Sequence, residues 1–336
     1  MLRIAVFALL ALPGAATLSA QPLRMVFVDT EGGQATLIVT PRGESLLVDA
    51  GFPGNNGRDA DRIVAAAKKL GLSRIDWLLV THYHLDHVGG VPELAAKFPV
   101  AAFADHGDNT ETSPQAKALE DAYRKVLATG ARRLTVKPGD TLPLNDVRIE
   151  IVAARGERIT RPVRGGGQKN PLCPQAERKA EDPTENARSI GFVLTFGRFR
   201  FVDLADLTWN KELELACPEH LIGPVDLYLT THHGLDQSGC PQIVHGMRPR
   251  VGIMNNGARK GGSPAAWRIV ASSPGLEDLW QLHYSLAGGK DANVAEERIA
   301  NLEPQCEGFG IEVEATRDRV ITVRNQRNGF TKTYRP

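Results

Sequence analysis

Apolar runs bounded by turn residues alternate along this chain with stretches of helical periodicity. Runs rich in β-branched and aromatic residues predict strands, and apolar residues repeating every three or four positions predict helices. The helix predicted at 113–129 also has Pro114 in its first turn and Gly130 just beyond its end, as helices often do. The predicted helices lie at 58–70, 113–129, 210–216 and 264–271. The predicted strands lie at 23–28, 35–40, 45–48, 75–80, 147–153, 190–196, 199–204, 225–231, 251–254, 311–315 and 320–324.

Strands and helices interleave in both halves of the chain, which predicts an α/β (α+β four-layer) fold of two sheets packed between helices. Residues 155–187 form a long polar insertion that contains Gly165-Gly166-Gly167. Loops of this length are usually functional or mobile. The pattern after about residue 286 is the least regular, and we expect a C-terminal extension there that completes the second sheet. Residues 21–336 are therefore expected to form a single domain.

The first 20 residues have the order of a secretory signal peptide. Arg3 precedes an apolar stretch at 4–12, and small residues lead up to Ala20. We expect cleavage after Ala20, with Ala16 as the alternative. The apolar stretch is shorter than the roughly 20 residues needed to span a bilayer. The sequence therefore favours a secreted or periplasmic protein with no membrane span after removal of the signal.

The composition of the chain is that of an ordinary globular protein. It has 336 residues, of which 42% are hydrophobic and 24% are charged. The whole chain has 40 basic and 39 acidic residues, and removing residues 1–20 takes away one Arg, which leaves a formally neutral protein. Nucleic-acid binders usually carry a basic surplus. Neutrality therefore argues against dedicated nucleic-acid binding.

Four cysteines, an even number in an exported chain, predict two disulfides. Three pairings of them are open, and we favour Cys173–Cys217 together with Cys240–Cys306. None of the four lies in a Cys-x-x-Cys pair. A cysteine-based zinc site is therefore not expected.

A cluster of histidines follows the predicted strand 75–80. The segment contains His82, His84, Asp86 and His87 and leads into Gly89-Gly90. Imidazole suits zinc and other first-row metals, and a carboxylate adds an oxygen ligand. On extended or turning backbone the first two histidines point one way, and the last two residues turn toward a second point. One short segment can thus serve two adjacent metal sites.

Three other predicted strands also end on metal-binding residue types. Strand 45–48 ends on Asp49, strand 199–204 leads to Asp206, and strand 225–231 leads to His232 and His233. Ligands at strand ends are held by rigid backbone. Asp203 is a second acid in the same strand as Asp206, but alternation places the two on opposite sides.

These segments, in this order, resemble the metallo-β-lactamase-fold hydrolases over most of residues 22–285. Within that superfamily the chain looks most like the exported metallo-hydrolase domain of the competence protein ComEC and the phosphorylcholine esterases. The features shared with those branches are Phe27-Val28-Asp29, Asn186-Ala187-Arg188-Ser189 and His232-His233-Gly234. The resemblance implies an αββα sandwich. A departure is that the Gly-Gln-Gly-Asp run of the competence branch reads Glu31-Gly32-Gly33-Gln34 here.

The resemblance also implies roles for individual residues. Each metal would take three ligands of its own, and Asp206 would bridge both. Asp49 would orient a metal-bound histidine. Asn186 stands where the family commonly has a histidine, and an amide oxygen binds zinc more weakly. The implied ligands are His82, His84 and Asn186 for the first metal, and Asp86, His87 and His233 for the second.

Two divalent ions roughly 3.5–4 Å apart can activate a shared water for attack. We expect the metal to be zinc, with manganese as the alternative. Catalytic roles are assigned to Asp86 and to His232, which would donate a proton. In the alternative assignment, His232 is the metal ligand and His233 the proton donor. His106 and His283 are candidates for the substrate pocket.

The leading hypothesis is hydrolysis of a phosphoester or phosphodiester, with a small-molecule or phosphoester substrate. The rival hypotheses are hydrolysis of a β-lactam, lactone or thioester, and a metal-binding protein without turnover.

Overall fold

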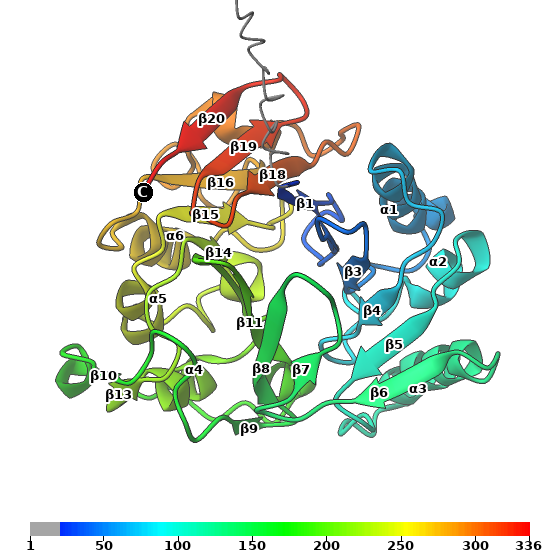
Figure 1. Ribbon diagram of the computed structural model, residues 1–336, viewed down its shortest axis with the longest axis horizontal. Coiled ribbons are helices and arrows are strands. Elements are labelled where there is room, and N and C mark those ends of the chain that lie inside the picture. Colours follow the sequence, from blue (N-terminus) through cyan, green and yellow to red (C-terminus); the bar gives the residue numbers. More distant parts are fainter. Residues whose placement is uncertain (1–20) are drawn as a thin grey trace, which may run out of the picture.

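The computed structural model describes residues 21–336, so the predicted signal segment 1–20 lies outside the described residues. Two large mixed sheets stand face to face (Figure 1). The first sheet contains, in spatial order, β20 (Thr331–Tyr334), β19 (Ile321–Asn325), β18 (Ile311–Ala315), β1 (Leu23–Phe27), β2 (Thr36–Val39), β3 (Ser45–Val48), β4 (Trp77–Leu79), β5 (Ala102–Asp105) and β6 (Arg132–Thr135).

The second sheet is built from the later part of the chain. It contains β17 (Ile299–Asn301), β16 (Asp278–His283), β15 (Val251–Met254), β14 (Leu227–Leu229), β12 (Phe199–Asp203), β11 (Gly191–Phe196), β8 (Arg148–Ala154) and β7 (Thr141–Leu142), and β9 (Glu157–Arg158) pairs with β8. The short strands β10 (Gln168–Lys169) and β13 (Glu219–His220) form a separate pair.

Helices cover the outer face of each sheet. The first sheet is covered by α1 (Arg58–Lys69), α2 (Val91–Lys97) and α3 (Pro114–Leu127), and the second by α4 (Trp209–Ala216), α5 (Pro241–Met247) and α6 (Pro264–Ala271). Five single turns of 3-10 helix complete the elements: η1 (Asn55–Gly57), η2 (Cys173–Gln175), η3 (Glu185–Arg188), η4 (Thr231–Gly234) and η5 (Glu296–Arg298).

Alternation along the strands explains the four layers. In β4, Leu79 packs in the core between the two sheets, and its neighbour Leu78 packs against the helices of the first sheet. In β12, Phe201 points into the core between the sheets, and Val202 packs under the helices of the second sheet. Each strand is apolar on both faces because each face is buried. The αββα arrangement expected from the sequence is confirmed.

The boundaries of the predicted helices agree closely with the structure. The prediction for 58–70 corresponds to α1, and the prediction for 113–129 corresponds to α3.

The expectation that the C-terminal extension completes the second sheet holds only for β17. Strands β18 to β20 instead extend the first sheet, because β18 pairs antiparallel with β1.

The polar insertion is attached to the second half of the fold at several points. Its strand β10 pairs with β13, and Asn170 donates hydrogen bonds to the carbonyls of Ala216 and Gln242, at 3.0 and 2.9 Å. A disulfide joins Cys173 to Cys217, as predicted. Loops of this length need such attachments to be held in one conformation.

The second predicted disulfide is wrong. Both remaining cysteines lie in the described part of the chain and are free: Cys240 is buried and Cys306 is half-buried. Cys240 packs in the core beneath α4 and α5, whereas Cys306 contacts Asp29 next to the first sheet. Counting cysteines did not reveal that the two lie in different layers.

Among residues 21–336, no helix combines the length and the apolar character that crossing a bilayer requires.

We expect thiol mapping of the oxidised protein to find one disulfide and two free thiols. Alkylation under denaturing, non-reducing conditions should label Cys240 and Cys306 and leave Cys173 linked to Cys217, as peptide mass spectrometry would show. The sequence separation of 44 residues corresponds to about 4 kcal/mol of loop-closure entropy, so the Cys173→Ala/Cys217→Ala variant should unfold at lower denaturant. A peptide linking Cys240 to Cys306 would contradict the structure.

Candidate metal centre

The candidate site lies where strands from both sheets end side by side. In the first sheet β3 and β4 run parallel, and the residues after them carry Asp49 and the histidine-rich segment. In the second sheet β12 and β14 run parallel, and the residues after them carry Asp206 and the His232-His233 turn. The carboxyl ends of parallel strands meet at one edge of a sheet, so the four loops converge.

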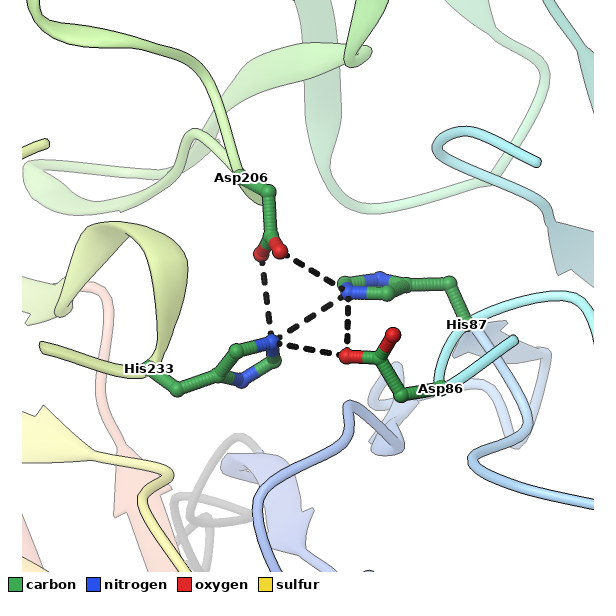
Figure 2. A group of neighbouring side chains, drawn as sticks. All are labelled: Asp86, His87, Asp206 and His233. Atoms are coloured by element: carbon green, nitrogen blue, oxygen red, sulfur yellow. Dashed lines mark hydrogen bonds and ion pairs between the residues drawn. The ribbon is translucent and has the colours of Figure 1, made fainter. Parts of the chain in front are cut away.

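Four of the predicted ligands converge on one point (Figure 2). The Nε2 atom of His233 lies 3.1 Å from Oδ2 of Asp86 and 3.3 Å from Oδ1 of Asp206. The Nε2 atom of His87 lies 3.2 Å from Oδ2 of Asp86 and 3.3 Å from Oδ2 of Asp206. One donor atom from each residue lies within 4.8 Å of all the others, and all four side chains are buried.

Two further histidines reach the same carboxylate of Asp206. The Nε2 atom of His232 is 3.3 Å from its Oδ2, and the Nε2 atom of His82 is 4.0 Å from it. Among the described residues, Nε2 of His82 is buried and has no hydrogen-bond partner. A buried nitrogen without a partner costs free energy unless a ligand satisfies it. The centre therefore has a nitrogen that fits a cation.

The opposite ring nitrogen of three histidines is held by a hydrogen bond. Nδ1 of His87 lies 2.7 Å from the Asp49 carboxylate, Nδ1 of His82 lies 3.1 Å from the Thr81 hydroxyl, and Nδ1 of His232 lies 3.2 Å from the Ser238 hydroxyl. Such bonds fix which nitrogen is left for a metal. In all three residues the atom directed at the cluster is Nε2, so the donor set fits divalent cations.

The ligands expected for the first metal are more loosely grouped. The ring of His84 lies 4.7 Å from that of His82, centroid to centroid, but His84 is not among the four closest ligands. Its Nε2 lies 3.0 Å from Oε1 of Glu111, which leaves Nδ1 as the free nitrogen. Asn186 is on η3, next to Glu185, which accepts a hydrogen bond from the backbone of Tyr83. Oδ1 of Asn186 is buried and lacks a hydrogen-bond partner within residues 21–336.

Electrostatics hold the carboxylates of the cluster in their charged form. Burial alone would raise the pKa of Asp86, but His87, His233 and Lys260 outweigh it and lower that pKa well below the ordinary value. Burial likewise opposes ionisation of Asp206, and its histidine neighbours lower its pKa. Metal ligands of this kind must be deprotonated, so the site is prepared for a cation.

The surroundings shift the pKa values of His87 and His82 in opposite directions. Burial disfavours protonation of His87, but Asp206, Asp86 and Asp49 outweigh it and raise the pKa of His87. Burial, followed by repulsion from His87, holds the pKa of His82 well below its usual value. His82 is thus neutral, as a metal ligand must be.

The loops that carry the site have unusual backbone conformations. Asp49, Ala205, His232 and His233 all have φ between 48° and 59°, in the left-handed region that non-glycine residues rarely adopt. Cross-loop bonds hold them there: the backbone N–H of His232 donates to the carbonyl of Ala205 at 2.8 Å. Strained residues of this kind cluster at functional sites.

Sequence reasoning did not identify several residues that support the site. Thr81 bridges His82 and Asp49, Glu111 holds His84, and Lys260 contacts Asp86. Glu212 on α4 is fully buried and accepts a hydrogen bond from the backbone of Cys240. Glu111, Lys260 and Glu212 lie outside the recognised motifs, so no sequence signal identified them, whereas Thr81 directly precedes His82.

The two candidate pocket histidines lie outside the cluster. His106 is buried, with its Nε2 2.9 Å from Oε2 of Glu185 and its ring against Tyr83. His283 is buried with its Nε2 2.8 Å from Oδ1 of Asp29. Burial opposes protonation of His283, but Asp29 and Cys306 together outweigh it and raise its pKa to about 9. Both side chains are occupied by acidic partners of their own.

Part of the chain is similar to known proteins. Residues 28–167 match the family model described as the metallo-beta-lactamase superfamily. A hydroxyacylglutathione hydrolase of Alkalilimnicola ehrlichii is 37% identical over 83 residues, which are 25% of this chain and 32% of that protein. An atrochrysone carboxyl ACP thioesterase of Aspergillus fumigatus is 32% identical over 107 residues, 32% of this chain and 33% of that protein. The chain therefore spans about a third of the length of these relatives.

Among solved structures, a β-hydroxylase, CmlA, has a TM-score of 0.46 and 19% identity, covering 78% of this chain and 52% of its own.

We expect Asp49→Asn to weaken divalent-metal binding about 10- to 100-fold, the usual effect of removing the carboxylate that orients a ligand histidine. The amide would lose the charge that holds Nδ1 of His87. Competition with a fluorescent chelator measures the affinity, and Asp61→Asn, a change at an exposed acid, serves as the control. Equal affinities of both variants and the wild type would show that Asp49 does not support the site.

Glu212 should make the metal-free protein less stable as the pH rises. Burial raises the pKa of Glu212 to about 7, whereas an unfolded glutamate has an ordinary pKa of about 4.3. Between these values the folded state binds more protons, so the free energy of unfolding falls with pH, by about 4 kcal/mol in total. In Glu212→Gln this contribution should disappear.

Urea unfolding between pH 4.5 and 7.5 measures this slope. Glu214→Gln changes a more exposed acid of the same helix, paired with Lys211, and should leave the slope as in the wild type. An identical slope in Glu212→Gln would mean that Glu212 is already ionised in the folded protein.

Proposed function

We propose that this protein, which carries a metallo-beta-lactamase superfamily domain, is an exported dinuclear metal-dependent hydrolase that cleaves a phosphoester or phosphodiester. The proposal rests on one observation, the convergence of Asp86, His87, Asp206 and His233 from three separate loops on one buried point. A solvated histidine-rich turn would not require the buried carboxylate of Asp206 from the second sheet.

The donor set divides into two groups around Asp206. Asp86, His87 and His233 would hold one cation, and His82, His84 and Asn186 would hold the other, with Asp206 between them. Two divalent cations at such a site lower the pKa of a shared water, polarise the scissile bond and stabilise charge on the leaving group.

The protein's own side chains have three tasks in this reaction. Asp49 fixes the ring of His87 through Nδ1, so its Nε2 remains a ligand. His232 contacts Asp206 through Nε2 and Ser238 through Nδ1, and burial lowers its pKa. A neutral His232 in this position would take a proton from the attacking water and then deliver it to the leaving group. The buried strand ends exclude bulk water from the charges.

The phosphoester assignment is supported by features shared with the ComEC-like and phosphorylcholine esterase branches. These include the segment at Asn186 and the His232-His233-Gly234 turn. Both histidines of this turn, His232 and His233, lie 3.3 Å from the Asp206 carboxylate. The substitution of Asn186 for a histidine ligand supports manganese as an alternative to zinc in the first site.

A second candidate is thioester hydrolysis, which the matched relatives favour. One is named a hydroxyacylglutathione hydrolase and another an atrochrysone carboxyl ACP thioesterase. The same buried cluster would serve either bond, because one scaffold hosts many chemistries. The substrate, rather than the ligand set, separates the two candidates.

We also propose that the protein works outside the cytoplasm. The Cys173–Cys217 disulfide supports this, since disulfides persist mainly in oxidising compartments. The thiol mapping described above tests the proposal in protein from its native host, where a cytoplasmic chain would show four free thiols.

The full chain, loaded with zinc or manganese, should hydrolyse bis-p-nitrophenyl phosphate. Asp206→Asn should lower kcat/KM at least about 100-fold and reduce the bound metal, because the shared ligand is lost. Asp203→Asn is the matched control: Asp203 is equally buried at the end of β12, three residues earlier, and contacts Gln34 instead of the histidines. Loss of activity in both variants would not support a specific role for Asp206.

The same preparations should be assayed in parallel with a hydroxyacyl-glutathione thioester. Turnover of the thioester alone would move the assignment to the second candidate. Absence of turnover on both substrates, with two metals bound per chain, would overturn the proposed activity and leave a metal-binding protein.

A further inference from the structure

A lysine from a separate loop reaches the candidate metal centre. The Nζ atom of Lys260 is in contact with Oδ2 of Asp86, donates a hydrogen bond to the carbonyl of Gly32 at 2.7 Å, and lies 5.5 Å from the centroid of the Phe52 ring. Its side chain is 34% exposed, so the ammonium is at the border between the buried ligands and solvent.

The backbone fixes this lysine from two sides. The carbonyl of Lys260 accepts a hydrogen bond from Gly257 at 2.8 Å, and the N–H of Gly262 donates to the carbonyl of His233 at 2.9 Å. On the other side, a Cβ added at Gly32 would lie 2.9 Å from Cβ of Lys260, so only glycine permits the approach of the two loops. The backbone around Lys260 therefore holds this side chain at the metal centre.

The charge balance of the site indicates a role for the ammonium of Lys260. In the structure, the ammonium of Lys260 compensates the buried carboxylate of Asp86. A divalent cation bound by Asp86 would compensate that charge itself, and the ammonium would then face an excess of positive charge. Opposite charges attract strongly at such partly buried sites. An anionic group arriving from solvent would restore the balance.

We propose that Lys260 is a specificity-determining residue that binds an anionic oxygen of the substrate beside the scissile bond. This inference rests on the proposed function, since it names the substrate class of the same site. The oxygen can belong to a phosphoryl group or to a carboxylate, because both accept charge-assisted hydrogen bonds from an ammonium. Substrates without such an oxygen would be poorly bound.

Inorganic phosphate and acetate are the probes, titrated calorimetrically into the metal-loaded full chain. Lys260→Gln removes the charge at similar length, and Lys260→Arg keeps it. The matched control is Lys97→Gln, which removes an ammonium paired with the exposed Asp61. Metal content is measured by mass spectrometry in every variant.

We expect Lys260→Gln to weaken phosphate binding about 10-fold or more and to raise KM for bis-p-nitrophenyl phosphate more than it lowers kcat. Lys260→Arg should stay within about 3-fold of the wild type, and Lys97→Gln should equal it. Tighter binding of acetate than of phosphate, lost in the same variant, would assign the oxygen to a carboxylate.

Three results would overturn the inference: no binding of either anion by the wild type, equal binding by Lys260→Gln, or loss of metal in Lys260→Gln. The last would show that Lys260 supports the ligand Asp86 instead. Lysine-dependent anion binding without hydrolysis of any ester would leave the anion site standing and refute the proposed activity. Hydrolysis with unchanged KM in Lys260→Gln would support the proposed activity and refute the role of Lys260 in binding the anion.

Discussion

Two carboxylates removed from water, those of Asp86 and Asp206, set the constraint that organises the centre of this fold. A buried charge costs several kcal/mol unless positive partners surround it. Here the partners come from three directions: His87 from the same segment, His232 and His233 from the second sheet, and Lys260 from the loop after β15. The two sheets must therefore be in register with each other at their strand ends for either carboxylate to be tolerated.

Much of this arrangement could be predicted from residue types and their positions. The order of apolar strands ending on Asp49, the histidine segment, Asp206 and His233 indicated which residues would converge, because parallel strands end at the same edge. Asp203 and Asp206 lie in different environments, as expected: Asp203 contacts Gln34, and Asp206 contacts the histidines. Strand alternation is not the reason, because β12 ends at Asp203 and Asp206 lies in the turn that follows.

Other features depend on three-dimensional contacts that leave no local pattern. Lys260 is far along the chain from Asp86 and lies in a loop with no metal-binding motif. Glu111 reaches His84 from a polar loop that resembles any other. The left-handed conformations of His232 and His233 are imposed by bonds between loops, against the preference of those residues. The wrong pairing of Cys240 with Cys306 has the same origin, since only the packing shows which layer each occupies.

The antiparallel pairing of β1 with β18 joins the beginning of the folded domain to its end. Leu23 stands opposite Ala315, and Phe27 stands opposite Ile311. Until β18 has been made, the first sheet therefore ends at β1, whose outer edge has no partner strand. Because pairings between such distant segments are slow to form, the nascent polypeptide remains open for most of its synthesis.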